Sequence, residues 1–317
     1  MNYWQQLVFV GSITLPVFSL VFIGIWLKWR GKIDDVFTAK SSYIVFNLAL
    51  PVLMFAAIVR TDIAEVGNPR LIIFAVLIAL LSFIIPWFSS RAFIADKKNL
   101  GVFVQGCFRS NLGILGLAFC VTTFAEKGLA VGALLLAVIT PLYNILSIYA
   151  LARAASEDSK LNGLALLKGV ITNPLIVAVS LALPFAYWQI TLPEVVMRSI
   201  DYLAAMTLPL ALICIGGSLS FTALRQTQWL SWVAVIIKLL LLPVAVAILA
   251  YLSGFRGVEL GCLILMFASP TASASFVMVR AIGGNHTLAA NIIALTTLIS
   301  LFTISIAIYS LKVFALI

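Results

Sequence analysis

The sequence predicts an all-α membrane protein with ten transmembrane helices, arranged as two inverted repeats of five. Three observations support this fold class: the composition, the length and number of the apolar segments, and an internal repeat. Of the 317 residues, 63% are apolar and 10% are charged, and the mean hydropathy is +1.17. Soluble domains are about half apolar and about a quarter charged. A soluble fold of this size could not bury so much apolar surface.

Ten apolar segments are long enough to cross a bilayer, which takes about 20 helical residues. Short loops separate them and leave no room for a soluble domain. No basic stretch precedes the first segment and no small-residue cleavage site follows it, so we expect it to remain as a span. The expected spans are residues 7–29, 42–59, 71–90, 100–124, 128–151, 164–188, 195–219, 229–252, 257–279 and 288–309.

The distribution of basic residues indicates the orientation. Twelve Lys and Arg residues fall on one side of the expected spans and six on the other, and cytoplasmic loops carry the excess. We therefore expect a multi-pass protein of the inner cell membrane with both termini on the non-cytoplasmic side. The formal net charge is +9, but the basic residues lie singly in short loops, so we expect no nucleic-acid partner.

An internal repeat appears when the chain is shifted by about 158 positions. The region around Asn111 then meets Pro270, and prolines of three further span pairs coincide: Pro16 with Pro174, Pro51 with Pro209 and, with one residue of slippage, Pro86 with Pro243. Five spans per repeat make the second copy insert upside down, as in many secondary transporters. The sequence thus predicts a first repeat over residues 1–153, a cytoplasmic linker over 154–163 and an inverted repeat over 164–317.

Two equivalent spans carry small and polar residues at their centres, from Gln105 to Gly113 in the fourth and from Ala268 to Ser275 in the ninth. In a membrane such residues suit an interrupted helix, because they satisfy the freed backbone groups. We expect interruptions near 109–113 and 269–273 that cross each other. Helix N-termini meeting there would attract an anion. The alternative is that Ser and Thr only join helices together.

Charge favours the anion-binding interpretation. Of the eleven acidic residues, none falls at a span centre, whereas Arg109 and Lys238 each lie about nine residues into a span. A charge at that depth marks a functional interior unless it reaches the interface by snorkelling. Cations without carboxylates favour an anionic solute, or a Lys238 that neutralises helix C-terminal dipoles at the interruption.

Metal and cofactor chemistry finds little support in the sequence. The four cysteines lie in apolar runs without metal-ligand spacing, and His286 is the single histidine, so we expect no metal site. We expect no cofactor. A sodium ion held by Ser, Thr and carbonyl oxygens stays open as a coupling ion.

Five stretches of the sequence match one family: Asn47 to Pro51, Ser110 to Gly116, Asn173 and Pro174, Lys238 to Pro243, and Ser269 to Thr271. Through them the chain resembles the auxin efflux carriers within the bile-acid, arsenite and riboflavin transporter superfamily. The resemblance implies ten helices as inverted repeats, with spans four and nine broken and crossing, and a small carboxylate such as malonate, malate or indole acetate bound beside the crossing. Arg109 lies outside the pattern of this family.

The resulting hypothesis is a secondary transporter that moves a small organic anion, with export as the favoured direction. Alternatives left open are a sodium-coupled anion symporter, a channel and a membrane-embedded enzyme, although no acidic pair or His-rich motif supports an enzyme. Membrane lipid surrounds the protein, and a homodimer is left open. The expected substrate-binding residues are Asn47, Pro51, Arg109, Ser110, Asn111, Gly113, Lys238, Ser269, Pro270, Thr271 and Ser273.

Overall fold

The computed structural model describes residues 3–60, 68–155, 171–219 and 228–317. These residues form helices joined by turns and short connections, with one isolated bridge between Ser110 and Thr271. Within this part of the chain, seven helices are long and apolar enough to span a membrane. The protein is therefore an α-helical, multi-pass membrane protein. The predicted linker lies outside the described residues from residue 156 onward, as does the start of the sixth expected span.

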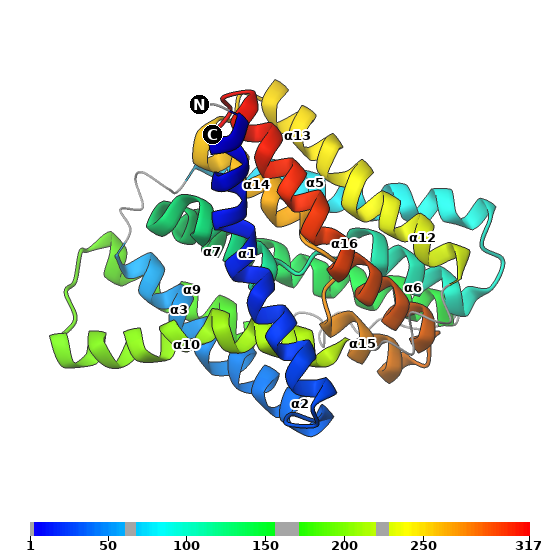
Figure 1. Cartoon of the computed structure of the whole chain (residues 1–317), viewed down its shortest axis with the longest axis horizontal. Helices are drawn as coiled ribbons and strands as arrows, with labels where there is room; N and C mark the ends of the chain where they lie inside the picture. Colours follow the sequence, from blue (N-terminus) through cyan, green and yellow to red (C-terminus); the bar gives the residue numbers. More distant parts are fainter. Residues whose placement is uncertain (1–2, 61–67, 156–170, 220–227) are drawn as a thin grey trace.

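Several helices begin at side chains that accept a hydrogen bond from the first turn, namely Asp34, Asn68, Asp96, Asn173 and Asn285, as stable N-caps do. Figure 1 shows the arrangement of the elements. They are α1 (Tyr3–Trp29), α2 (Asp35–Ile44), η1 (Val45–Ala49), α3 (Leu50–Val59), α5 (Pro69–Ser89), η2 (Ser90–Ala92), α6 (Lys97–Phe108), η3 (Leu112–Gly116), α7 (Leu117–Ala155), α9 (Pro174–Tyr187), α10 (Glu194–Ser218), α12 (Trp229–Ile236), η4 (Ile237–Leu241), α13 (Leu242–Leu252), α14 (Gly257–Ala268), α15 (Ala274–Ile282) and α16 (His286–Val313).

The structure has seven long apolar helices among the described residues where ten spans are expected, because some expected spans are interrupted, shortened or merged. The fourth and ninth expected spans are interrupted, and Pro174–Tyr187 and Gly257–Ala268 are shorter apolar helices. α7 contains a non-helical residue, Ala125, with φ 52° and ψ −132°. A Cβ at Gly128 would lie 2.0 Å from the carbonyl oxygen of Cys120, so the chain after Ala125 runs back against the segment before it. The fourth and fifth expected spans therefore meet at a tight reversal rather than at a loop.

π-helical turns precede two of the prolines inside expected spans. η1 comes just before Pro51, and η4 comes just before Pro243. Proline has no backbone N–H and its ring displaces the carbonyl of the preceding turn, and a π-turn absorbs this misfit within an otherwise continuous helix. Pro51 and Pro243 thus widen their helices without breaking them.

The helices form two groups. The first group consists of α1, α2, η1, α3, α9 and α10, and Figure 1 shows α3, α9 and α10 together at the lower left. The second group consists of α5, α6, η3, α7, η4 and α12 to α16, and its helices pack mainly against one another. α1 contacts α16 and α3 contacts α7, which joins the groups.

Two glycines allow α1 and α10 to cross at backbone distance. A Cβ at Gly24 would lie 2.2 Å from the carbonyl oxygen of Ile213, and one at Gly216 would lie 2.0 Å from that of Val21. Because apolar side chains gain little from leaving lipid, membrane helices associate through such close contacts between small residues. These two glycines are therefore the basis of the α1–α10 contact.

The surface also fits a membrane. Large apolar side chains of α1, α5 and α13 are exposed, and the tryptophans Trp29, Trp188 and Trp229 are exposed near helix ends, where membrane proteins place aromatic residues at the interface. Lys312, near the end of α16, lies 4.7 Å from the ring centre of Phe9 in α1. The two ends of the chain therefore lie at the same end of the molecule, as Figure 1 shows.

Candidate functional site

Two helical paths are interrupted in the stretches that the sequence singles out. Three residues separate α6 from η3, and five separate α14 from α15. The interruptions run antiparallel against each other. The N–H of Asn111 donates to the carbonyl of Pro270 at 2.7 Å, and the N–H of Ala272 donates to the carbonyl of Arg109 at 3.0 Å. Each interruption thus satisfies backbone groups that the other leaves free, which is what non-helical backbone inside a membrane requires.

Side chains of the second interruption strengthen this crossing. The hydroxyl of Thr271 donates to the carbonyl of Gly106 at 2.8 Å, and the N–H of Thr271 donates to the hydroxyl of Thr296 in α16 at 3.1 Å. The hydroxyl of Ser269 donates to the carbonyl of Leu265 at 2.8 Å. Ser269 and Thr271 are buried, and both hydroxyls donate to backbone carbonyls. Thr271 joins the second interruption to α6, as in the alternative in which Ser and Thr join helices, whereas Ser269 bonds within α14.

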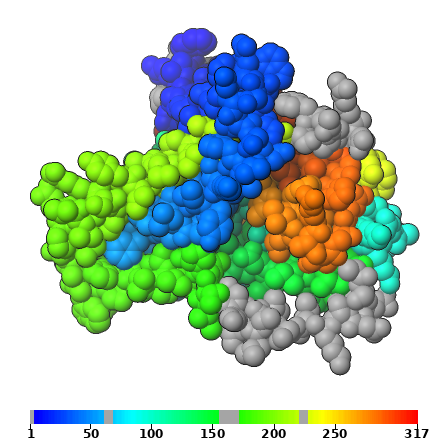
Figure 2. All heavy atoms as spheres, turned by 90° about the horizontal axis from the view of Figure 1, so that it is seen from below, coloured from blue at the N-terminus to red at the C-terminus, as the bar shows by residue number. Residues whose placement is uncertain are grey.

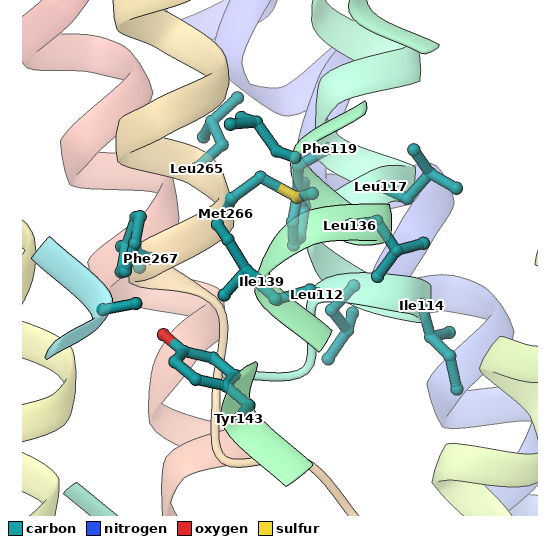
Figure 3. Packing of buried hydrophobic residues seen from close by; sticks show 14 of the residues in the cluster. Leu112, Ile114, Leu117, Phe119, Leu136, Ile139, Tyr143, Leu265, Met266 and Phe267 are labelled. Atoms are coloured by element: carbon teal, nitrogen blue, oxygen red, sulfur yellow. The ribbon is translucent and has the colours of Figure 1, made fainter. Parts of the chain in front are cut away.

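Gly116 of η3 and Met266 of α14 determine how closely these two helices approach each other. A Cβ at Gly116 would lie 2.8 Å from the sulfur of Met266 and 3.1 Å from the hydroxyl oxygen of Ser269. Figure 3 shows Met266 and Leu112 among the buried apolar side chains between α14 and η3–α7. The crossing is therefore embedded in a tightly packed apolar core.

Lys238 forms hydrogen bonds to both interrupted helical paths at the crossing. It lies in η4 and is fully buried, with 0% exposure. Its ammonium donates to the carbonyl of Phe267 at 2.9 Å and to the hydroxyl of Ser110, and that hydroxyl lies 3.3 Å from the same carbonyl. Phe267 is in the last turn of α14, where the helix dipole is negative. The geometry thus matches the interpretation in which Lys238 neutralises a helix C-terminus.

Arg109 reaches the other way, onto the second half of α7. Its Nη1 donates to the carbonyl of Tyr143 at 3.1 Å and to the hydroxyl of Ser147 at 2.9 Å, and its Nη2 donates to Oδ1 of Asn144 at 2.7 Å. Arg109 is 7% exposed, and its Nε has no hydrogen-bond partner within the described residues. The snorkelling alternative does not fit a guanidinium held in this way.

A small cavity of about 50 Å³ lies beside the crossing. Asn111 lines it and is 5% exposed, and its side chain makes no capping hydrogen bond to the first turn of η3. The η3 and α15 helices begin at the cavity, so their N-termini bring partial positive charge to it. None of its lining residues is acidic, and they are Phe46, Arg109, Ser110, Asn111, Leu112, Gly113, Leu136, Thr140, Tyr143, Leu175, Ala272, Ser273 and Ala274.

The cavity lies where the two groups of helices meet. Phe46 of η1 and Leu175 of α9 come from the first group, and the other lining residues come from the second. Figure 2 shows this junction from below, with the blue α2–α3 segment between the green α9–α10 and the orange α14–α15 segments.

Comparison with known proteins identifies the family. The family model described as "Membrane transport protein" matches residues 9–308, almost the whole chain. The chain belongs to this family of transporters. It is 26% identical over 303 residues to a protein of Methanothermobacter thermautotrophicus named "Uncharacterized transporter", which covers 94% of this chain and 98% of the relative. It is 26% identical over 313 residues to a Rhizobium meliloti protein named "Putative malonate transporter", covering 96% of each.

These names describe transporters rather than enzymes. The membership confirms the resemblance to the auxin efflux carriers and fits the absence of an acidic pair or His-rich motif in the sequence.

The expected binding residues divide into two sets in this transporter. Arg109, Ser110, Asn111, Gly113 and Ser273 line the cavity. The other six do not. Lys238, Ser269, Pro270 and Thr271 support the crossing, Pro51 is buried in α3, and Asn47 is exposed with its Nδ2 donating to the carbonyl of Tyr43 at 2.9 Å.

Sequence reasoning missed the contribution of the fifth expected span. Thr140 and Tyr143 line the cavity, and Asn144 and Ser147 hold Arg109. Thr140, Asn144 and Ser147 recur at intervals of four and three residues, which places them on one face of a helix. A polar face of this kind in an otherwise apolar helix can be recognised from the sequence alone.

Proposed function

We propose that this membrane transport protein is a carrier for a small organic anion, and that a carboxylate of the solute binds in the cavity beside the crossing. The observation that carries the proposal is the charge of the cavity. Arg109 is buried in its wall without an acidic partner among the described residues, and the amide of Asn111, which also lines the cavity, lies two residues away. A buried cation of this kind is costly unless a counter-ion joins it.

The same proposal includes the ten-span inverted repeat. Seven helices among the described residues are long enough to span the membrane. One of them divides into two spans, because α6 with residues 112–124 forms the fourth and the rest of α7 forms the fifth. α14 with α15 forms a ninth span, and α9 brings the number to ten. An even number of spans suits two termini at one end of the molecule. The basic loops favour the non-cytoplasmic side for both.

The direction we propose is export. With the cell interior negative, moving one elementary charge through about 100 mV is worth about 2.3 kcal/mol, and for an anion this free energy favours exit. Uptake would need a coupled cation. The part of the cavity wall that we describe holds no carboxylate to carry a proton, so a sodium ion bound by neutral oxygens is the coupling ion that the uptake alternative requires. No cofactor is needed for either direction.

The test compares two asparagines of the same chain in proteoliposomes loaded with radiolabelled malonate. Asn111→Ala is expected to lower malonate flux at least tenfold, because the removed amide faces the cavity. Asn47→Ala is the matched control, because Asn47 is exposed and bonded to its own helix, and its flux should equal that of the parent. Equal flux from the two variants at equal amounts of inserted protein would contradict the proposed site.

A further inference from the structure

An apolar groove of about 460 Å³ lies between α13 and α16. On η4 and α13 its lining residues recur every three or four positions from Leu240 to Leu252, and on α16 they do so from Thr303 to Phe314, so one face of each helix borders it. Ile264 of α14 also lines the groove and is buried. None of the described residues that line this groove lines the cavity at the crossing, so the two are separate.

The groove lies where the eighth expected span changes its packing partner. α12 and η4 pack against α16, whereas α13 packs mainly against α14. Ala247 of α13 and Ala307 of α16 line the space between, and their short side chains leave it open. Ile248 and Ile306 border it and are more than half exposed, so the groove opens to the surface. In a membrane that surface is covered by lipid.

The groove has the depth of one leaflet of the bilayer. Its inner end is at Leu240, two residues after Lys238 at the crossing, and its outer end is at Leu252, the last residue of α13. Twelve helical positions rise about 18 Å, and half of the hydrocarbon core is about 15 Å deep. Figure 1 shows α13 and α16 running to the end of the molecule where the termini lie. An acyl chain that entered at this end would therefore reach the middle of the membrane.

Two arginines lie on the turn that joins α13 to α14, at the outer end of the groove. The guanidinium carbon of Arg256 lies 3.8 Å from the ring centre of Tyr251, which lines the groove. Its Nη1 donates to the carbonyls of Tyr251 at 2.8 Å and Phe255 at 2.6 Å. Nη2 of Arg70 donates to the carbonyl of Ser253 at 2.7 Å. Both arginines are exposed, so they are cations fixed by backbone carbonyls at a membrane surface.

The charge of this turn favours an anion. Glu259 is the acidic residue nearest to Arg256 in the sequence, and its Oε1 accepts from Nδ2 of Asn68 at 2.9 Å. The ion pairs of the described residues leave both Arg70 and Arg256 without an acidic partner. Guanidinium groups bind phosphate oxygens well, and basic residues at the membrane surface attract anionic lipids. An apolar groove with cations at its outer end therefore matches the acyl chain and the phosphate of an anionic phospholipid.

We propose that the groove binds one anionic phospholipid, with an acyl chain against α13, α14 and α16 and the phosphate on Arg256 and Arg70. The site is separate from the cavity at the crossing, so the proposal does not depend on which solute the carrier moves. The chain packs against Ile264 of α14 and Leu240 of η4, two elements that Lys238 bonds or belongs to at the crossing. The bound lipid therefore stabilises the crossing.

The test is native mass spectrometry of the purified full-length protein in detergent. The protein is titrated with dioleoyl phosphatidylglycerol or with dioleoyl phosphatidylcholine, which share their acyl chains and differ in net charge. We expect phosphatidylglycerol to bind about fivefold to twentyfold more tightly, since each arginine near the headgroup contributes about fivefold. The same lipid should raise Tm in a thermal-shift measurement.

The headgroup position is tested at Arg256. Arg256→Gln should weaken phosphatidylglycerol about fivefold and leave phosphatidylcholine unchanged, whereas Arg256→Lys keeps the charge and should keep most of the preference. Arg198→Gln is the matched control, because Arg198 is an exposed arginine of α10 in the other group of helices, and its preference should equal that of the parent.

The acyl-chain position is tested on α13. Ala247→Phe fills the groove with a ring, so the variant should lose the bound lipid of either kind and the rise in Tm. Ala245→Phe is the matched control, because Ala245 is exposed on the same helix and does not line the groove; it should bind lipid as the parent does.

Three results would overturn the proposal. The first is equal binding of the two lipids by the parent, or a full preference retained by Arg256→Gln. The second is equally tight phosphatidylglycerol binding by Ala247→Phe and Ala245→Phe, which would place the acyl chain outside the groove. The third is a dimer that Ala247→Phe dissociates while no phospholipid is bound, which would assign the groove to a second copy of the chain.

Discussion

The substitution Lys238→Met tests whether this buried lysine supports the fold or the solute. The ammonium is bonded to the carbonyl of Phe267 and to the hydroxyl of Ser110, and it does not line the cavity. Methionine fills a similar volume without a donor, so the crossing loses both contacts. We therefore expect lower stability with unchanged affinity for the solute.

The magnitude follows from two opposing contributions. A hydrogen bond to a charged group contributes about 1.5–3 kcal/mol, so the two bonds together are worth about 3–6 kcal/mol by the same scale. Removing the ammonium also removes the cost of burying a charge, which is several kcal/mol. The carbonyl of Phe267 retains the hydroxyl of Ser110 at 3.3 Å. The net loss should be about 1–3 kcal/mol of the free energy of unfolding.

The assay is thermal unfolding of the purified protein in detergent, followed by tryptophan fluorescence. On the scale of soluble domains, the expected loss lowers Tm by about 2–10 °C. Lys312→Met is the matched control, because this lysine lies at a helix end against the ring of Phe9, and its Tm should change by less than a degree or two. An unchanged Tm for Lys238→Met together with a tenfold weaker malonate response would refute the reasoning and make Lys238 a solute ligand.

Two other predictions concern packing and energetics. Gly24→Leu should abolish the α1–α10 contact and sharply reduce the yield of folded protein, because its Cβ would lie 2.2 Å from a backbone oxygen, whereas Gly11→Leu meets no atom closer than 3.6 Å at Cβ and should express normally; comparable yields would contradict this packing. In proteoliposomes, an inside-negative potential should speed malonate exit and slow its entry. Flux that ignored the potential and sodium but followed a proton gradient would overturn the proposed energetics.

Much of the fold could be predicted from the sequence because membrane physics acts on local composition. A helix must satisfy its own backbone in lipid, so apolar length locates spans, and polar centres such as Ser110–Asn111 and Ser269–Thr271 locate interruptions. The structure interrupts the chain at both. The count of separate helices was harder to foresee. The reversal at Ala125 depends on the close approach of Gly128 to Cys120, a tertiary contact that composition does not reveal.

The site was less predictable, because whether a residue lines the cavity depends on the direction of its side chain rather than on its depth in the membrane. Ser110 and Ser269 have the same chemistry and equivalent places in the two interruptions, yet Ser110 belongs to the cavity wall with its hydroxyl on Lys238 and Phe267, and Ser269 bonds to its own helix. Asn47 belongs to a family-like stretch but is exposed, while its neighbour Phe46 lines the cavity. One residue of helical rotation, about 100°, separates these outcomes.

The two buried cations show how a single sequence signal divides into two physical roles. Lys238 and Arg109 are both basic residues deep in apolar helices, and both lack acidic partners among the described residues. Lys238 is a compact charge on a flexible stem, and it reaches a helix C-terminus where carbonyls take the place of a carboxylate. Arg109 is one of the residues that line the cavity, and its Nε has no hydrogen-bond partner among the described residues. Lys238 is bonded at the crossing and lies away from the cavity wall, whereas Arg109 belongs to that wall, and for this reason the proposed anion site is placed beside Arg109.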